Sequence, residues 1–432
     1  MATPVGSTPH PRRSAWFLVA VCAGAIGYLT LSPASGEPGT TFFCLICGSR
    51  GGVDAVLNVC LFAPLGFALV LCGVRPARAI VLMFVVSACI EATQFFAIAG
   101  RDATFGDITT NTIGGSIGVA ISYWRLTLLR PSPRLARYLC IASGAVWLAI
   151  QLVVSFAFAP SLPATRYYGQ IARSFAAMAA FPGAVLDARI GATPIPDVAI
   201  PDSAGVRALL LRNAPLSAVV VPGPATPRLA PIVRIADSRR EEIVMLGQDG
   251  RAAIFGVRAG ASELRLRPPL FRLPNAFPAA SHAARDSGTV RLFVRYGRAV
   301  RLQAEREQAS PARDIAVTVG LGWTLILPGQ WYIEGTAGES ILTGLWLLAS
   351  VTPLGFWIGW MRSFTRRARA VRARAAVTLI LAALFTVGLD AVPQRAGLAP
   401  EGLFHLLAAA AGIVAGLLLS RLMAQRPANS LM

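Results

Sequence analysis

Eight mostly apolar stretches, each close to the length of a membrane-spanning helix, constrain this chain more than any other feature. A helix needs about 20 predominantly apolar residues to cross a hydrocarbon core of ~30 Å. Of the 432 residues, 55% are hydrophobic and only 14% are charged. The sequence therefore predicts a polytopic α-helical membrane protein of about eight transmembrane helices, near residues 14–31, 53–73, 77–98, 107–124, 138–158, 340–360, 375–392 and 402–420.

The first of these stretches has a second interpretation. It follows Arg12 and Arg13, as the apolar part of a signal peptide would. Such a segment ends at a small-residue cleavage site, and Leu29 to Pro33 matches one poorly. We therefore interpret it as a retained helix that follows a cytoplasmic tail of residues 1–13.

The net charge of +19 is distributed on one side of the predicted spans. The tails 1–13 and 421–432, and the loops after the second, fourth and sixth spans, are rich in Arg and contain no Asp or Glu. Because short Arg-rich loops stay in the cytoplasm, we predict a multi-pass protein of the inner (plasma) membrane with both termini cytoplasmic. The charge is thus an orientation signal that favours membrane lipid, and no nucleic acid, as a partner.

A long hydrophilic insert, residues 160–325, separates the fifth and sixth predicted spans. Apolar and β-branched residues alternate there in runs typical of strands: Ser217–Val221, Pro231–Ala236, Glu242–Leu246, Ala252–Val257, Glu263–Arg267, Thr289–Val294, Ala299–Leu302 and Asp314–Val319. Asp249-Gly250 lies between two runs and favours a hairpin, because this pair tolerates the positive φ of a type I′ turn. We predict an inserted all-β sandwich, extracytoplasmic because five spans precede it.

Regularly spaced polar residues mark the segment from residue 58 to residue 118. They read N-x5-PLGF and then E-x2-Q-x6-R-x5-D-x3-NT-x-GG-x2-G. Ionisable groups are expensive at membrane depth, so they indicate a functional site or a buried pair. The candidate polar site comprises Asn58, Glu91, Gln94, Arg101, Asp107 and Asn111, and the candidate helix-packing positions are Pro64, Gly66, Gly114, Gly115 and Gly118.

Helix geometry predicts that these polar side chains meet at the outer membrane face. Asp107 and Asn111 are four residues apart and share one helix face, and Arg101 in the preceding loop is placed to pair with Glu91 or Asp107. One interpretation is purely structural, with Asp107 as an N-cap, Asn111 as an interhelical hydrogen bonder and Glu91 paired with Arg101. The other interpretations are a binding site for a polar headgroup and, less specified by these residue types, an active site whose catalytic residues are unknown.

The cysteines and histidines predict neither a metal site nor a cofactor. Cys44 and Cys47 form a C-x2-C pair in a predicted outer loop, with no second pair and no nearby His. A disulfide and two free thiols both remain open for this pair. His405 is interpreted as a packing or capping residue.

Two resemblances accompany these patterns. Residues 51–125 resemble the VanZ family of membrane proteins, named after an accessory factor of glycopeptide antibiotic resistance, in their N-x5-PLG, E-x2-Q, R and D-x3-N-x2-G elements. Ile232 to Pro278, with EIVMLGQDGR at its centre, is similar to the concanavalin-like (LamG) sandwich inserted in some VanZ-like proteins. The resemblances imply a VanZ-like membrane domain at 14–158 and an outward domain for glycan or protein recognition.

The predicted C-terminal membrane region, residues 340–420, is similar to a degenerate copy of the first block. Pro353 to Phe356 repeats the Pro-Leu-Gly-Phe of Pro64 to Phe67. Further along, one offset of 294 pairs Arg101 with Arg395, Asp107 with Glu401, Asn111 with His405 and Gly118 with Gly412, and places Glu91 on the apolar Phe385. Duplication and chance both remain open.

The leading functional interpretation is a non-enzymatic protein of the bacterial cell envelope. Its expected partners are a membrane lipid and a cell-wall precursor or glycan, and the family name suggests a link with antibiotic resistance. The alternatives are an intramembrane enzyme acting on a lipid-linked headgroup through Glu91, Arg101 and Asp107, and a transporter.

Overall fold

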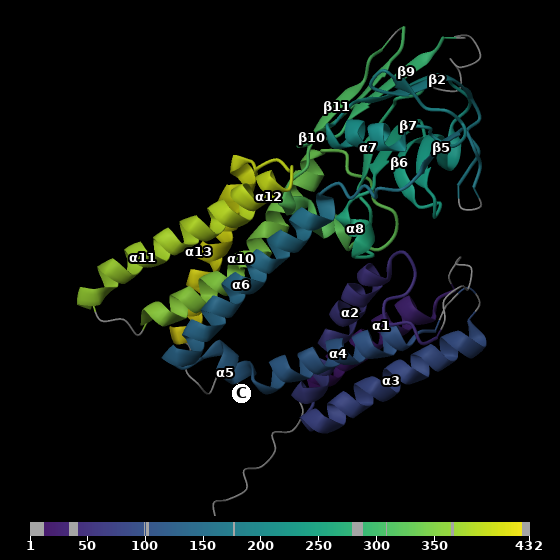
Figure 1. The fold of residues 1–432 in the computed structure, drawn as a ribbon. Helices are drawn as coiled ribbons and strands as arrows, with labels where there is room; N and C mark the ends of the chain where they lie inside the picture. Colours follow the sequence, from purple (N-terminus) through teal and green to yellow (C-terminus); the bar gives the residue numbers. More distant parts are fainter. Residues whose placement is uncertain are drawn as a thin grey trace, which may run out of the picture. The chain divides into compact units, whose positions relative to one another are not determined.

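The computed structural model describes residues 13–33, 42–98, 100, 103–175, 178–278, 288–307, 309–363 and 367–425. The chain divides into two units, one of residues 1–137 and 420–432 and the other of residues 138–419. Each unit has its own group of long helices, and the strands belong to the second unit (Figure 1).

Four long helices build the first unit: α1 (Arg13–Leu31), α2 (Gly51–Leu71), α3 (Pro76–Ala97) and α4 (Phe105–Tyr123), followed by the short α5 (Arg125–Leu129). Their apolar composition drives helix formation in lipid, where every backbone group must be paired within the helix. Pro76 begins α3, where its fixed φ suits the first turn. The most extensive packing in this unit joins α2 to α4, and α3 also contacts α4.

Glycines allow α2 and α4 to approach at backbone distance. A Cβ atom built on Gly66 would lie closer than 3 Å to the backbone of Gly115, and one built on Gly118 would lie 2.8 Å from Phe67 N. Real Cβ atoms essentially never come this close to backbone atoms. Small residues at such spacing are the usual means by which membrane helices pack tightly, so the seam between α2 and α4 depends on glycine.

Two antiparallel sheets form the β sandwich of the second unit. One sheet has the order β1-β5-β6-β7-β8, and the other has the order β11-β10-β9-β4-β2-β3. The bounds are β1 Tyr167–Ile171, β2 Ala184–Ile190, β3 Thr193–Pro194, β4 Leu216–Val221, β5 Thr226–Asp237, β6 Glu242–Gly250, β7 Ala252–Val257, β8 Leu270–Leu273, β9 Val290–Arg295, β10 Ala299–Glu305 and β11 Ala312–Ala316, with helices α7 (Ser203–Leu211) and α8 (Gly260–Glu263).

The turn from β6 to β7 follows the predicted Asp249-Gly250 signal, since Gly250 has a φ of +60°. The predicted strand at Glu263–Arg267 is wrong. Glu263 ends α8, and Arg265 has a φ of +51°, so the chain turns there and cannot extend. The apolar residue Leu266 of this run packs against the hydrophobic core and so stabilises the turn.

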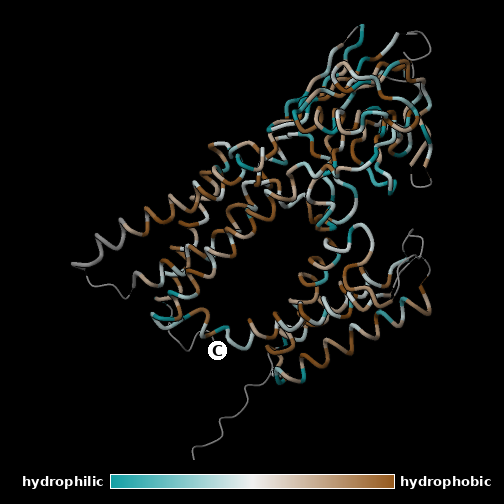
Figure 2. Tube along the Cα trace, viewed as in Figure 1, coloured by the Kyte–Doolittle hydropathy of each residue, from teal (hydrophilic) through white to brown (hydrophobic). Residues whose placement is uncertain are grey.

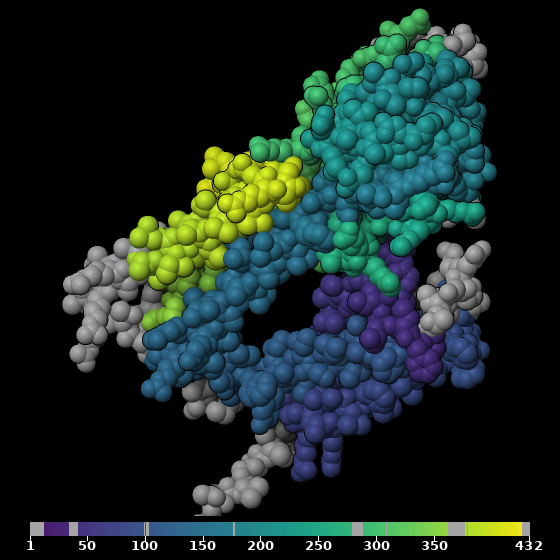
Figure 3. Space-filling model, viewed as in Figure 1, coloured from purple at the N-terminus to yellow at the C-terminus, as the bar shows by residue number. Residues whose placement is uncertain are grey.

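The sandwich is inserted between two helices of the second unit, α6 (Pro133–Phe158) and α10 (Ala337–Ser363). A buried 3-10 segment, η1 (Val319–Leu325), precedes α10, and α11 (Arg367–Thr386), the π turn Val387–Ala391, α12 (Val392–Arg395) and α13 (Leu403–Gln425) follow it. One hydrophobic core includes both Leu292 of β9 and Leu347 of α10. In the space-filling view the green β domain adjoins the yellow C-terminal helices (Figure 3).

Six described helices are long and apolar enough to cross a membrane: α1, α2, α3, α6, α10 and α13. Apolar residues dominate these helices, whereas hydrophilic residues are prominent in the β domain (Figure 2). The two remaining predicted spans are occupied by α4 and α11, which are not among the six. Asp107, Asn111 and several hydroxyl side chains lie in α4, and α11 begins in an Arg-rich stretch.

Candidate functional site

A pocket of about 420 Å³ lies in the first unit, between α2, α3, α4 and the loop that precedes α2. Its volume is in the usual range for small-ligand sites, ~300–1,000 Å³. Most of the lining is polar, and the residues are Thr30, Leu45, Cys47, Gly48, Ser49, Arg50, Gly51, Asp54, Ala55, Asn58, Glu91, Gln94, Gly100, Thr104, Gly106, Asp107, Thr110 and Asn111.

Five of the six predicted polar residues line this one pocket. Asn58 comes from α2, Glu91 and Gln94 come from α3, and Asp107 and Asn111 come from α4. The sixth, Arg101, lies outside the described residues. The motif that is dispersed over 54 residues of sequence, from Asn58 to Asn111, is thus gathered around one cavity.

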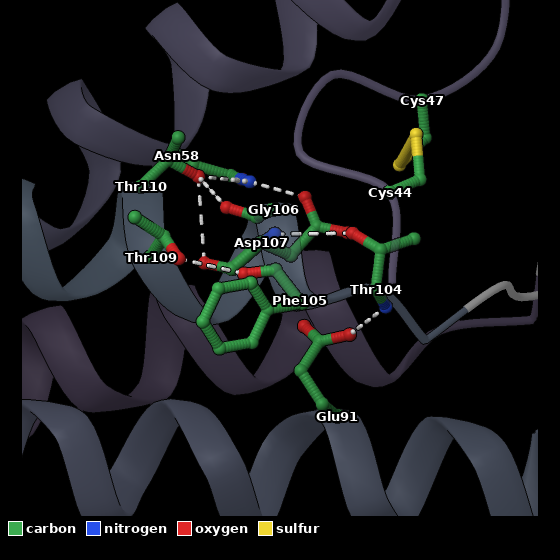
Figure 4. The surroundings of a disulfide bond; sticks show 10 residues. All are labelled: Cys44, Cys47, Asn58, Glu91, Thr104, Phe105, Gly106, Asp107, Thr109 and Thr110. Atoms are coloured by element: carbon green, nitrogen blue, oxygen red, sulfur yellow. Dashed lines mark hydrogen bonds between the residues drawn. A yellow bond between two sulfur atoms is a disulfide. The ribbon is translucent and has the colours of Figure 1, made fainter. Parts of the chain in front are cut away.

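Asp107 connects α4 to α2 through a charge-assisted hydrogen bond. Its Oδ1 accepts from Asn58 Nδ2 at 2.7 Å, and its Oδ2 accepts from the Thr104 hydroxyl at 2.7 Å (Figure 4). The Asp107 backbone N–H in turn donates to Thr104 Oγ1. Thr104 is therefore the N-cap of α4, and the interpretation of Asp107 as the N-cap is wrong. The pair is a reciprocal capping arrangement, with the acidic residue three positions after the cap.

Glu91 and Gln94 fix the C-terminal end of α3 to neighbouring segments. Glu91 is 3% exposed, and its Oε2 accepts from the backbone N–H of Thr104 at 3.0 Å. Gln94 donates from Nε2 to the carbonyl of Thr30, at the end of α1, at 2.8 Å. Both side chains therefore join α3 to the segments around the pocket, and both also line the pocket.

Asn111 lies deepest of the α4 residues in the motif and is only 2% exposed. Its Nδ2 donates to Ser87 Oγ on α3 at 3.0 Å. Its Oδ1 has no hydrogen-bond partner within the part of the chain that the structure describes. A buried acceptor left unpaired costs about 1–3 kcal/mol, and Asn111 Oδ1 has almost no accessible surface, so a donor could reach it only if the amide turned toward the pocket.

The loop before α2 closes the pocket on the side of the α4 N-terminus. A disulfide joins Cys44 to Cys47 (Figure 4). The Gly106 N–H donates to the Cys44 carbonyl at 3.0 Å, and a Cβ on Gly106 would lie 2.8 Å from the Leu45 carbonyl carbon. This close docking requires glycine at position 106.

The sequence motif omitted several lining residues. Arg50 is the N-cap of α2, and Asp54 lies one turn before Asn58 on the same helix. The spacing Asp54-x3-Asn58 repeats that of Asp107-x3-Asn111 and could have indicated Asp54. The contribution of residues 45–51 has no such signal, because it depends on how the loop docks on α4. No group of three or more potential metal ligands was found among the described residues.

Comparison with known proteins assigns the region that holds the pocket. Residues 21–128, roughly a quarter of the chain, match the family model described as VanZ/LLP1. No curated protein and no solved structure matches the chain. The match confirms the resemblance inferred from the polar motif, and every lining residue of the pocket falls inside it. The chain therefore carries a VanZ-like membrane region at residues 21–128, accompanied by an inserted β sandwich.

Proposed function

We propose that the VanZ-like region binds the polar headgroup of a membrane lipid or of a lipid-linked cell-wall precursor in the pocket between α2, α3 and α4. The observation that carries this proposal is the gathering of polar side chains around a cavity between α4 and two helices, α2 and α3, that are long and apolar enough to cross a membrane. Polar groups are costly to bury in such helices, so they usually occur there where a ligand or a partner is bound.

The polarity of the lining suits a headgroup that brings hydrogen-bond donors to the pocket floor. Asn111 lines the pocket, and rotation of its amide would bring the unpaired Oδ1 to a ligand donor. On the side of the loop before α2, the Arg50 guanidinium would attract an anionic group such as a phosphate, and the Asp54 carboxylate in the first turn of α2 would attract an ammonium group. A headgroup in which a hydroxyl, amide or ammonium group is linked to a phosphate would match both ends of the pocket.

The membrane arrangement in this proposal has eight spans and cytoplasmic termini. The Arg-rich segments support it, because they fall on one side of the alternating spans. The Cys44–Cys47 disulfide supports an oxidising, outer location for the pocket rim. The β sandwich would then be extracytoplasmic, where a concanavalin-like domain could recognise a glycan or a protein of the envelope, and a role in glycopeptide resistance belongs to the same proposal.

The proposal is tested by presenting purified full-length protein in nanodiscs with a panel of phospholipids and lipid-linked precursors. Native mass spectrometry would report which headgroup is retained. Asn111→Leu should abolish retention and lower the melting temperature only modestly, since it removes an unpaired buried acceptor together with one hydrogen bond to Ser87 Oγ, and such a bond is worth about 0.5–1.5 kcal/mol. Thr112→Val is the matched control, because Thr112 is the next residue of α4 and does not line the pocket.

Equal retention by wild type and Asn111→Leu would remove the proposed site. Parallel loss of folded protein and of ligand in Asn111→Leu, but not in Thr112→Val, would reduce the polar cluster to helix packing.

A further inference from the structure

The C-terminal helices α10 and α13 approach each other through the same set of contacts as α2 and α4. A Cβ atom on Gly412 would lie closer than 3 Å to the backbone of Leu348, as one on Gly114 would to Val59. A Cβ on Gly416 would meet Thr352 O and Phe356 N, as one on Gly118 would meet Ala63 O and Phe67 N. Gly355 faces Ile413 O in the way that Gly66 faces Gly115 O.

These contacts obey one residue correspondence on each helix. The same difference of 289 relates Val59 to Leu348, Ala63 to Thr352 and Gly66 to Gly355. A difference of 298 relates Gly114 to Gly412, Gly115 to Ile413 and Gly118 to Gly416. The packing therefore differs from the single offset of 294 suggested by the sequence, and it pairs Asp107 with His405 instead of Glu401.

The correspondence identifies the counterpart of the polar pocket. On α10, Ser340, Thr343 and Leu347 take the positions of Gly51, Asp54 and Asn58. On α13, His405 and Ala409 take the positions of Asp107 and Asn111. Thr343, Leu347 and Ala409 are fully buried, so this place is filled.

The occupant is the chain's own segment η1, in which all seven residues are buried. Trp323 donates from its indole Nε1 to Thr343 Oγ1 at 3.0 Å, and the Gly320 N–H donates to Glu401 Oε1. Position 320 leaves no room for a side chain, since a Cβ there would lie 2.7 Å from Glu401 Oε1 and 2.5 Å from Thr343 Cγ2. The segment is thus held by hydrogen bonds that it donates to Thr343 of α10 and to Glu401, two residues before α13.

A hydrogen-bonded chain of side chains fixes the acceptor for this segment. His405 Nδ1 lies 2.7 Å from Glu401 Oε2, and His405 Nε2 lies 3.1 Å from Ser340 Oγ. The side chain of Glu401 is fully buried and that of His405 is 17% exposed. His405 therefore positions the carboxylate that receives the Gly320 N–H. Through Ser340 it also links α13 to α10, from the position on α13 that corresponds to Asp107 on α4.

We infer that α10 and α13 form a second site of the VanZ-like type, and that its ligand is the chain's own segment Val319–Leu325. The β sandwich occupies the connection between α6 and α10, and η1 is its exit toward α10. Occupation of the site by η1 thus ties the sandwich to the C-terminal helices. This inference goes beyond the proposed function and does not depend on what the first pocket binds.

The test distinguishes two possibilities. Either Val319–Leu325 occupies a site that α10 and α13 form without it, or this segment is a part of the core that α10 and α13 need in order to pack. A reporter thiol at Thr324→Cys, 3% exposed in the segment, is placed in a protein otherwise depleted of cysteine. A second sample carries Gly344→Cys and Ala408→Cys, because a Cβ on Gly344 lies 3.5 Å from Ala408 Cβ, within disulfide range. Both samples are made with Gly320→Val, with Thr343→Val, and with the control Gly402→Ala, whose Cβ would meet nothing within 4 Å.

Gly320→Val should accelerate maleimide labelling of the reporter at least tenfold while the α10–α13 cross-link still forms. Thr343→Val, which removes only the acceptor for Trp323, should accelerate labelling to a smaller extent, and Gly402→Ala should leave labelling unchanged. Protection of the reporter in both Gly320→Val and Thr343→Val would overturn the inference. Loss of the cross-link together with exposure of the reporter would also overturn it, because the segment would then be part of the helix core.

Discussion

Replacing Gly118 by alanine should destabilise the first unit, whereas the same replacement at Gly24 of α1 should not. A Cβ at position 118 would lie 2.8 Å from both the Ala63 carbonyl carbon and Phe67 N. The Ala63 carbonyl oxygen would lie closer still, and ordinary contact begins near 3.4 Å, so α2 and α4 must separate locally by more than ~0.6 Å. Both neighbours are backbone atoms and cannot rotate away. At Gly24 an added Cβ would meet nothing within 4 Å.

The expected loss is the cost of overpacking reduced by the helix propensity of alanine. Forcing an extra carbon into a packed seam typically costs ~1–3 kcal/mol. Alanine is favoured over glycine in a helix by roughly 0.5–1 kcal/mol. The difference between these ranges is about 0–2.5 kcal/mol, and the backbone neighbours, which cannot move aside, place Gly118→Ala in the upper half at about 1–2.5 kcal/mol. The loss is larger if the 2.7 Å bond between Asn58 and Asp107 lengthens with the seam. The Gly24→Ala variant should be unchanged or slightly stabilised.

Reversible unfolding of the purified protein in mixed micelles measures this difference. The two variants should be compared with wild type under identical lipid conditions. A Gly118→Ala variant within ~0.5 kcal/mol of wild type would refute the tight seam, and an equal loss in Gly24→Ala would show that glycine matters for another reason.

Three further outcomes are expected. A single reporter cysteine at Ala164 should react with an impermeant thiol reagent on intact cells and one at Ala77 should not; the reverse pattern would contradict the proposed orientation. Tyr296→Phe should lower the free energy of unfolding by about 1–3 kcal/mol in thermal or chemical denaturation, because the buried hydroxyl donates to the Phe158 carbonyl at 2.7 Å and that acceptor would be left unpaired. Burial raises the pKa of Glu242 above its usual value, although Arg234 lowers it, so its contribution to stability is fully present below the unfolded pKa and is lost as pH rises through the folded pKa. Glu242→Gln should therefore gain stability relative to wild type as pH rises above the ordinary carboxyl pKa, and melts with equal pH slopes would contradict this.

Local sequence patterns predicted the helices and most strands. The length of an apolar stretch and the alternation of apolar and polar residues along a strand can both be read from neighbouring residues. The exception at Glu263–Arg267 shows the limit of such patterns. Alternating Leu264 and Leu266 fit a strand, yet Arg265 adopts a left-handed turn and Arg267 donates to the distant Leu327 carbonyl. This hydrogen bond joins residues 60 positions apart, so no local pattern in the sequence could reveal it.

The polar residues of the site were also found from spacing, since helix geometry places them on facing surfaces. The boundary of the pocket was not predicted, because the Gly106–Cys44 hydrogen bond depends on how the loop before α2 docks on α4. The correspondence between the two helix pairs was missed for a related reason. Its helix offsets, 289 and 298, differ by nine residues, so no single offset through the sequence can align both helices.

The most direct test of the central claim is photo-crosslinking from inside the pocket. A small diazirine amino acid is incorporated at Ala55, which lines the pocket, or at the adjacent Val56, which is 37% exposed and does not line it. After irradiation in native membranes, mass spectrometry identifies the part of any bound molecule that is attached. The proposed function predicts a polar headgroup fragment at position 55 and acyl chain alone at position 56, whereas acyl chain alone at both positions, or no adduct at position 55, would contradict a headgroup site.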